Sequence, residues 1–365
     1  MNYDFSQIPA QGDKYASRLR LRHCGRLQFL KHAVSVELGG HGDSFEALVM
    51  AHHSLGKQCL DSGLILSINA HLWGAIFPLI TYGSIQQRQR WLPALLSGEM
   101  IGGHAITEPQ AGSDINALTT TATLTDKGFI LKGHKRFITN SPIADTLVVY
   151  AKLEGKLTAF LVKNDDKKVF FTDNHQITGC SSATMGDVLL ESCLIPSDRR
   201  LGKIGAGPSI IQNALELERA FVFAGISGIM SWQLETIVKY SRERQVNGVH
   251  LGQNQAISHK IADMKLRLDT INLWLYECAR LKMKNKRLTL ASAQTKLYAS
   301  ESFLQSSLDA IQIMGTKGLL STHKMNNLVH DALASRLFSG SSEIQKNMIA
   351  ALLGTGEGYQ GPEKK

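Results

Sequence analysis

The chain has 365 residues, of which 43% are hydrophobic and 19% are charged, and its formal net charge at pH 7 is +9. A chain of this length and composition can bury a large core, which we expect to be divided over two or three domains. No apolar run is long enough for a membrane span, and the first residues lack the apolar core of a secretory signal. The five cysteines are scattered, with no close-set pair that would suggest zinc, and predict reduced thiols in a cytoplasmic protein.

The positive charge has two interpretations, and the sequence leaves both open. The charge either belongs to a basic soluble surface without a specific role or attracts an anionic partner, such as a nucleotide, a phosphopantetheine thioester or an acidic carrier protein. Nucleic acid is not expected as a partner, because the basic residues are spread along the chain. The longest basic cluster, 282–287, lies between two predicted helices and carries no recognition motif.

Three stretches of different periodicity follow one another along the chain. Apolar residues recur three and four positions apart between 15 and 100, and predict helices that are interrupted at Gly39, Gly40 and Gly83. An alternating pattern follows, with strands predicted at 119–125, 129–131, 135–138, 146–151, 158–162, 169–172 and 187–190. Helical periodicity returns from 209 to 353. This order predicts an α+β protein with domains at 1–102, 103–206 and 207–355 and a tail at 356–365.

The stretch AITEPQAGSD, residues 105–114, is predicted to be a turn that exposes polar groups. Thr107 and Ser113 offer short hydroxyls, and Pro109 fixes one backbone angle. Gly112 allows the main chain to approach a planar or charged ligand closely. As chemistry alone, the stretch is a moderate signal for a binding loop.

A second polar segment, GHKRFITNSPIAD, spans residues 133–145, and Gly133 is predicted to form a turn between two strands. The segment would bring the ring of Phe137 near the hydroxyl of Thr139 and the amide of Asn140. Such a set suits a flat heterocycle, with a ring to pack against it and donors for its edge atoms. The spacing alone favours an ordinary strand that ends in a polar turn.

Both segments resemble the flavin-contacting segments of the acyl-CoA dehydrogenase family, whose patterns are T-E-P-x-A-G-S-D and G-x-K-x-[WF]-I-T-N. The resemblance implies an FAD cofactor that is held by Thr107, Ser113, Phe137 and Thr139. It also implies the fold of that family, with an N-terminal helical domain, a central β domain and a C-terminal four-helix bundle.

The resemblance continues to the end of the chain. Arg244, in YSRERQVNG (240–248), takes the place of an arginine that reaches the FAD pyrophosphate of a neighbouring subunit, a role that suits a guanidinium fork. The other FAD contacts that the resemblance implies are Gln255, Gln312, Gly340, Ser341 and Glu343. It therefore implies a homotetramer, or at least a dimer. Residues 1–25 have no convincing counterpart, and the first helix is expected to be shortened.

The resemblance also implies a reaction, in which a carboxylate base removes the proton alpha to a thioester while flavin N5 takes a hydride from the beta carbon. A dry pocket makes such a carboxylate a stronger base. In the majority pattern the base precedes the glycine that matches Gly340, but Ser339 stands there and has no useful basicity of its own. Glu343 matches a cofactor-contacting position and is not expected to be the base.

A second location for the base is known in the family, on the first long helix of the C-terminal domain, where a Glu directly precedes an Arg. The corresponding residues are Glu218 and Arg219 in ALELERAFVF (214–223). The residues three and four positions from Glu218 are apolar, so its carboxylate is expected on an apolar face. The structural alternative is that Glu218 forms an ion pair with an arginine, which locks two helices together. We predict that Glu218 is the base.

Three further departures from the family pattern restrict what the resemblance implies. Asn247 replaces a phenylalanine that packs on adenine, and Thr316 replaces a glycine beside the cofactor. His104 stands where an aromatic residue is common. His104 is predicted to be a partly buried structural histidine, with contact to substrate as the alternative.

The resemblance implies FAD-dependent α,β-dehydrogenation of an acyl thioester, carried by CoA or by an acyl carrier protein, with substrate contacts from Ser113, Arg219 and Gly340. The relocated base favours specialised relatives that act on acyl or aminoacyl groups of carrier proteins in natural-product assembly lines. Either an electron-transfer flavoprotein or oxygen would reoxidise the flavin. Two alternatives remain open, a flavin oxidase or monooxygenase on the same fold and a catalytically silent flavoprotein.

Overall fold

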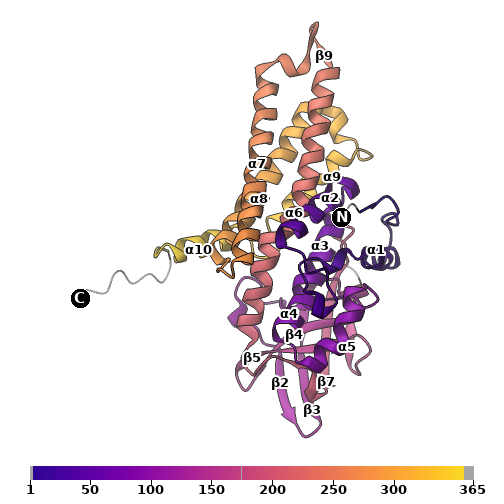
Figure 1. Ribbon diagram of the computed structural model, residues 1–365, viewed down its shortest axis with the longest axis vertical. Coiled ribbons are helices and arrows are strands. Elements are labelled where there is room, and N and C mark those ends of the chain that lie inside the picture. The colour runs from indigo at the N-terminus through magenta and orange to yellow at the C-terminus, as the bar shows by residue number, and fades with distance from the viewer. Residues whose placement is uncertain (1–2, 174, 357–365) are drawn as a thin grey trace, which may run out of the picture.

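The computed structural model describes residues 3–173 and 175–356. Figure 1 shows an elongated molecule, in which the long C-terminal helices stand above a twisted sheet and the N-terminal helices pack against both. Except for Gly356, the predicted tail 356–365 lies outside the described residues. The order of helices, strands and helices agrees with the sequence prediction.

The N-terminal helices begin at residues that the sequence marks as caps. The side chains of Asp13, Ser44 and Asp61 accept hydrogen bonds from the first turns of α1, α2 and α3. The helices are α1 (Lys14–Arg26), α2 (Phe45–Cys59), α3 (Ser62–His71), α4 (Phe77–Tyr82) and α5 (Ile85–Leu96). A single π-helical turn, Leu72–Ile76, joins α3 to α4. This region therefore presents one nearly continuous buried helix to the sheet and to the C-terminal helices.

The central sheet is mixed, and within the described residues it has eight strands. They are β1 (Gly102–Ala105), β2 (Thr121–Thr125), β3 (Gly128–Thr139), β4 (Thr146–Leu153), β5 (Lys156–Lys163), β6 (Val169–Phe171), β7 (Met185–Ile195) and β8 (Arg200–Leu201). The order is β6-β7-β3-β2-β4-β5-β8, and β1 pairs in parallel with β4. Strand β1 was not predicted, because Gly102 and Gly103 have no side chains and therefore show no alternation of apolar and polar residues.

The prediction of a turn at Gly133 is wrong, because β3 runs unbroken from Gly128 to Thr139. The glycine allows a close approach to Thr120, the residue before β2, since a Cβ at Gly133 would lie 2.3 Å from Thr120 Oγ1. The pairing of β3 with β7 is irregular between Lys135 and Ile138. This irregularity lies at the predicted flavin segment and re-aims the side chains there.

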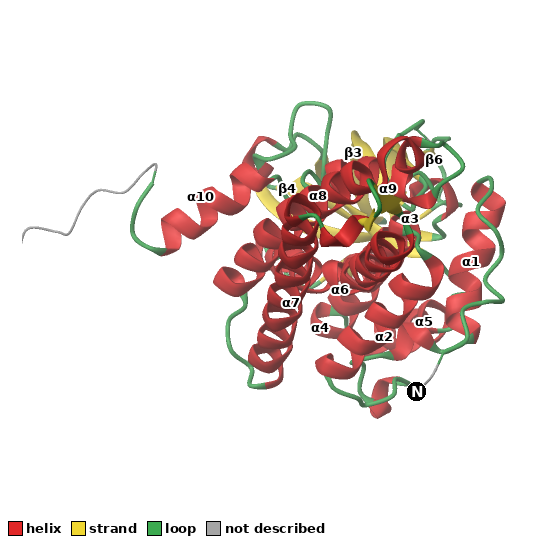
Figure 2. Ribbon diagram, turned by 90° about the horizontal axis from the view of Figure 1, so that it is seen from above, coloured by secondary structure: helices red, strands yellow, loops and turns green. Residues whose placement is uncertain are grey.

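The C-terminal region returns to helices, as predicted, and most of them form a bundle. They are α6 (Gly207–Glu243), α7 (Gln255–Met283), α8 (Thr289–Met314), α9 (Lys324–Ser335) and α10 (Ser342–Leu352), with the small hairpin β9 (Gln245–Val246) and β10 (Val249–His250) after α6. Short 3₁₀ turns connect several elements, at Phe29–Lys31, Val36–Leu38, Ile115–Ala117, Ser141–Ile143, Ser197–Arg199, Leu251–Gln253 and Gly315–Leu319. Figure 2 shows α10 projecting away from the other helices.

Two helical stretches are apolar and long enough, by composition, to cross a membrane. They are Ser62–Tyr82 and Gly207–Glu243, and 94% and 67% of their most apolar windows are buried inside the protein. Their hydropathy is therefore that of core helices, which pack against each other at α3 and α6. The core of the helical regions is continuous along these two stretches.

Candidate active site

The predicted binding loop 105–114 is fastened to the predicted flavin segment of β3. The backbone N–H of Arg136 donates to the carbonyl of Thr107 over 2.8 Å. Thr107 and Thr139 are half-buried, Ser113 is exposed, and none of their hydroxyls bonds to another described residue. The two segments therefore meet, as the resemblance implies, and their hydroxyls are available to a polar cofactor edge.

A buried ion pair holds this loop in place. Lys135 Nζ lies 2.7 Å from Glu108 Oε1, and the two side chains are 0% and 1% exposed. Burial by itself would raise the pKa of Glu108, but hydrogen bonds from Lys135 and Thr120 outweigh it and lower the pKa to about 2. Burial lowers the pKa of Lys135 to about 8, against the attraction of Glu108. Lys135 also donates to the carbonyl of Ile106 over 3.1 Å, so a single ammonium ties down two points of the loop.

Phe137 has the exposure and the backbone of a binding residue. Its side chain is 50% exposed and its φ is 57°, a left-handed conformation that is strained for a bulky residue. Its ring lies 5.2 Å from the ring of His175 and 4.8 Å from the guanidinium carbon of Arg136. A strained, exposed aromatic ring next to free hydroxyls fits the flat ring system of a flavin.

The amide of Asn140 does not take the role that its spacing suggested. Asn140 is fully buried, and its Nδ2 donates to the carbonyls of Ser67 over 2.9 Å and Gly102 over 3.2 Å. The amide nitrogen therefore ties β3 to α3 and β1. The hydroxyls of the segment are therefore its candidate donors to a ligand, and the Asn140 amide nitrogen is not, because it already bonds to two backbone carbonyls.

Glu218 lies on α6 and is buried, as its apolar helical neighbours predicted. Its Oε1 accepts a hydrogen bond of 2.6 Å from Ser339 Oγ. Its Oε2 lies 3.6 Å from His104 Nε2 and has no hydrogen-bond partner among the residues that the structure describes. The alternative of an ion pair with an arginine is not found within the described residues. The structure therefore leaves one oxygen of a buried carboxylate open.

The loop that carries Ser339 is held over Glu218 by side chains from three elements. Arg219 Nε donates to the carbonyl of Ser339 over 2.9 Å, and Gln345 Nε2 donates to the carbonyl of Gly340, also over 2.9 Å. Lys296 Nζ donates to the carbonyl of Arg336 over 2.8 Å. Arg219 was predicted to bind substrate, but its Nε is engaged with this loop. Its buried guanidinium therefore positions the segment that faces Glu218.

The backbone of this loop explains its glycine. Ser339 and Gly340 have φ values of 56° and 91°, and a Cβ at Gly340 would lie 2.8 Å from Gln345 Nε2. Ser341 caps α10, where its Oγ accepts from the backbone of Ile344, and Glu343 is exposed in the first turn of that helix. Gly340 and Ser341 directly follow Ser339, whose hydroxyl bonds to Glu218, so the same loop places them near Glu218. Glu343, in contrast, is exposed at the surface.

Three predicted cofactor contacts lie far from this centre in the same chain. Arg244 ends α6, so at 1.5 Å per residue it is separated from Glu218 by about 39 Å along the helix. Gln255 begins α7 and Gln312 lies near the end of α8, and all three side chains are exposed. These residues cannot complete the site of their own subunit, and their exposure leaves them accessible to a neighbour.

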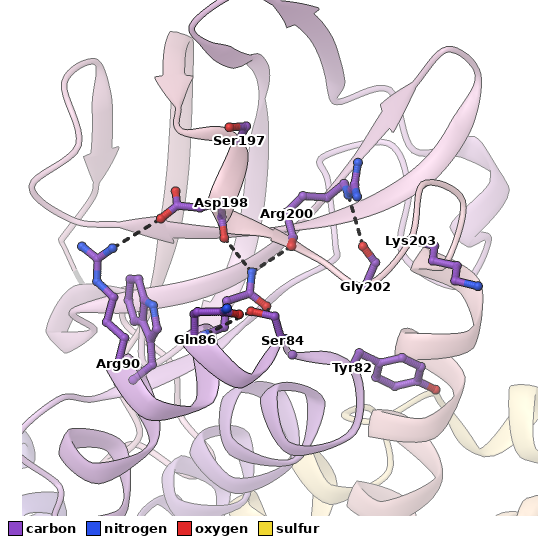
Figure 3. A pocket seen from close by; sticks show the side chains of 12 residues that line it. Tyr82, Ser84, Gln86, Arg90, Ser197, Asp198, Arg200, Gly202 and Lys203 are labelled. Atoms are coloured by element: carbon purple, nitrogen blue, oxygen red, sulfur yellow. Dashed lines mark hydrogen bonds and ion pairs between the residues drawn. The ribbon is translucent and has the colours of Figure 1, made fainter.

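A cavity of about 550 Å³ lies between α5 and the segment before α6, as Figure 3 shows. Its polar groups are largely engaged with one another. Gln87 Nε2 donates to the carbonyls of Asp198 and Arg200, and Arg90 lies 3.5 Å from Asp198. None of the predicted site residues lines this cavity, so we place the active site at Glu218.

Within the described residues no group of three His, Cys, Asp or Glu side chains is arranged to hold a metal ion.

Sequence reasoning missed two contacts of the site. It treated Ser339 as the position of a lost base, although its hydroxyl bonds to the carboxylate of Glu218, and it treated His104 as a structural residue. His104 is indeed mostly buried, with 14% of its side chain exposed, but its imidazole faces Glu218. The replacement of an aromatic residue by histidine was the available signal, and only the contact between His104 on β1 and Glu218 on α6 gives it meaning.

Three models of the acyl-CoA dehydrogenase family match the chain in order. The N-terminal domain matches residues 6–99, the middle domain 103–193 and the C-terminal domain 205–354. The first match begins at residue 6 and includes α1, which corrects the expectation that residues 1–25 have no counterpart. The predicted fold class, with two helical domains around a β domain, is confirmed.

Individual relatives are similar over nearly their whole length. An L-prolyl-[peptidyl-carrier protein] dehydrogenase of Pseudomonas fluorescens is 33% identical over 94% of this chain and 93% of its own. The prolyl acyl carrier protein oxidase AnaB is 35% identical, with a TM-score of 0.90 over 92% of this chain and 90% of its own. A structure described as PigA with FAD and proline is 30% identical, with a TM-score of 0.91 over 97% and 99%. Matching domain models and such relatives show that the protein belongs to the acyl-CoA dehydrogenase family.

Proposed function

We propose that the protein oxidises a prolyl group held as a thioester on a carrier protein, with Glu218 as the base. As a member of its family it is an FAD-dependent oxidoreductase that acts on a CH–CH bond of an acyl thioester. The observation that carries the proposal is the contact between Glu218 and Ser339. The carboxylate from α6 lies beside the position at which the majority pattern has its base.

The chain's own residues supply binding, orientation and proton transfer. Thr107, Ser113 and Thr139 would hold the polar edge of FAD and Phe137 its ring system, and the bound cofactor accepts the hydride. Glu218 takes the alpha proton on Oε2, the oxygen that has no hydrogen-bond partner among the described residues. Ser339 fixes the other oxygen, so the carboxylate cannot rotate freely.

The surroundings of Glu218 support a small acyl group. Phe221, one turn further along α6, lies 5.7 Å from Trp73 and 5.1 Å from Phe45 between ring centroids, and Phe77 lies 4.6 Å from Trp73. Trp73, Phe77 and Phe221 are buried and Phe45 is half-buried, so the four rings form a packed aromatic cluster beside the turn of α6 that follows Glu218. A five-membered ring fits such a site better than a long acyl chain. The relatives named for prolyl carrier substrates give the same substrate class.

Anaerobic flavin reduction tests the substrate. The FAD-loaded protein is mixed in a stopped-flow instrument with prolyl carrier protein, prolyl-CoA and butyryl-CoA at equal concentrations. We expect the prolyl carrier protein to bleach the flavin at least tenfold faster than either CoA thioester, because the carrier adds binding energy at the protein surface. Equal rates with prolyl-CoA would remove the carrier from the proposal, and a faster reaction with butyryl-CoA would remove the prolyl group.

The same reduced protein distinguishes the electron acceptors. Reoxidation by dissolved oxygen at the rate of turnover would make the protein an oxidase. Reoxidation only by an added electron-transfer flavoprotein would make it a dehydrogenase. Oxygen consumption measured during turnover reports directly on the first case, and hydroxylated product would identify the monooxygenase alternative.

We also propose that the protein works as an oligomer, a dimer or a homotetramer. Arg244, Gln255 and Gln312 are exposed at the end of the bundle away from Glu218, where they are accessible to another subunit. A stripe of exposed apolar residues along α7 supports a second copy as the partner, and its members are Leu266, Leu273, Tyr276 and Met283. These residues recur at spacings of seven, three and seven, so they share one face of the helix.

Replacing Leu273 by aspartate should dissociate the oligomer. The side chain is 71% exposed in the single chain, so the substitution places a charge in the stripe without disturbing the subunit core. Light scattering after size exclusion measures the mass, and we expect a decrease to that of one chain together with loss of FAD. Leu124→Asp, at an exposed leucine of β2, is the matched control. An unchanged mass for Leu273→Asp would place the interface elsewhere.

We propose a reducing compartment, the cytoplasm, as the location of the protein. All five cysteines are free thiols, and four of them are buried. Burial raises the pKa of Cys24 to about 12 and that of Cys278 to about 11, which keeps both thiols neutral and unreactive. The test is a count of free thiols in protein that was purified without reductant and then unfolded. Fewer than five labelled thiols would contradict the proposal.

A further inference from the structure

His104 is held in place by the backbone of the helix that packs against its strand. It lies on β1, opposite the π-helical turn between α3 and α4. A Cβ at Gly74 in that turn would lie 2.8 Å from the backbone nitrogen of His104 and 3.1 Å from its Cγ. Only a glycine allows this approach, so the imidazole is held by main-chain packing on one side.

On its other side the imidazole faces the open oxygen of the base. His104 Nε2 lies 3.6 Å from Glu218 Oε2, which is somewhat longer than a hydrogen bond. Neither Oε2 nor His104 Nδ1 has a hydrogen-bond partner among the described residues. A buried carboxylate oxygen without a partner is unfavourable, and a small side-chain rotation would bring the Nε2 donor within reach.

The other charged groups around Glu218 have hydrogen-bond partners of their own, although the charges of Arg219 and Glu218 also attract each other. Arg219 Nε donates to the carbonyl of Ser339, and Lys296 donates to the carbonyl of Arg336. Glu216, on the same helix, accepts hydrogen bonds from Gln212 and Thr289. His104 is therefore the titratable side chain that faces Oε2 from a packed neighbouring element. Burial lowers the pKa of His104 and the charge of Glu218 opposes this shift, so the imidazole is neutral at pH 7 and donates from one nitrogen.

We propose that His104 is a positioning residue that donates from Nε2 to one lone pair of Glu218 Oε2, which leaves the other lone pair for the alpha proton. Together with Ser339 on Oε1, it keeps the carboxylate ionised and aimed at that proton. This inference rests on the proposed role of Glu218 as the base. A donor on each oxygen favours the charged form of a carboxylate.

Three substitutions of His104 distinguish a hydrogen-bond donor to Glu218 from a side chain that only fills space. His104→Phe removes both ring nitrogens, His104→Asn places an amide near the position of Nδ1, and His104→Gln places one near the position of Nε2. For the Phe and Asn variants we expect the acid limb of the anaerobic flavin-reduction profile to move up by about one to two pH units. The rate on that limb then falls by about tenfold to a hundredfold. His104→Gln should restore the wild-type midpoint to within half a pH unit.

The pattern among the variants decides between the two roles. A purely structural histidine would lower FAD content or thermal stability and leave the midpoint unchanged, so both are measured beside each profile. Wild-type midpoints in His104→Phe and His104→Asn would overturn the proposal. A midpoint that stays shifted in His104→Gln would overturn it too, because the Nε2 donor would then be irrelevant.

A second measurement does not depend on turnover. Ring ¹⁵N spectra of the FAD-loaded protein report the titration of His104, whose signal is assigned by its absence in His104→Gln. In Glu218→Gln we expect the titration midpoint of His104 to fall, because the charge that raises it is gone. An unchanged midpoint would show that the two groups are not coupled. If no thioester reduces the wild-type flavin, the proposed function fails, and the spectra still decide whether the pair exists.

Discussion

Glu218→Gln should lower the rate of flavin reduction by prolyl carrier protein by a factor of about 10² to 10⁴, the usual contribution of a general base. Glutamine keeps the shape of the side chain and can still accept the hydrogen bond from Ser339 Oγ, but it cannot take the alpha proton. The protein should therefore stay folded, yellow and loaded with FAD. Stopped-flow absorbance under anaerobic conditions measures the effect.

Glu216→Gln is the matched control, because it removes a carboxylate two residues away on the same helix. Glu216 is hydrogen-bonded to Gln212 and lies apart from Ser339 and His104. We expect its rate to stay within about twofold of wild type, because the half-buried Glu216 forms hydrogen bonds with Gln212 and Thr289 and with neither Ser339 nor His104. A Glu218→Gln protein that bleaches at the normal rate would show that Glu218 is not the base.

Lys135→Met should have the largest effect on stability, a loss of about 3–5 kcal/mol in the free energy of unfolding. Lys135 is completely buried, and the substitution leaves the buried carboxylate of Glu108 without its cation. The binding loop also loses the bond from Lys135 Nζ to the carbonyl of Ile106, so FAD content should fall with stability. Urea unfolding followed by tryptophan fluorescence, together with the flavin absorbance of the purified protein, measures both.

The effect of Lys135→Met should also depend on pH in a defined direction. The folded-state pKa of Glu108 is about 2, below its ordinary value of 4.5, so the ionised carboxylate adds stability above pH 4.5. That contribution is lost as the pH falls from 4.5 towards 2, and the difference between wild type and variant should narrow over the same range. Lys132→Met, at an exposed lysine of the same strand, should unfold like wild type at every pH. An equal loss in both variants would attribute the effect to the strand.

The order of the elements could be predicted from the sequence because it depends on local chemistry. Periodicity of three and four marks helices, alternation marks strands, and Asp13, Ser44 and Asp61 mark helix starts, all within a few residues of chain. The error at Gly133 has the opposite origin. Its reason is the side chain of Thr120, which is distant in sequence and adjacent only in the sheet.

The candidate site divides in the same way. The sequence by itself determined the family. It also predicted the two flavin segments and Glu218, in place of Ser339, as the base, since motifs and helical spacing are carried by neighbouring residues. Only the tertiary structure decided that Ser339 and His104 meet the carboxylate of Glu218, because packing brings β1 and the loop before α10 to the same point on α6. Hydrogen bonds form between groups that are close in space, and their separation along the chain carries no signal of that closeness.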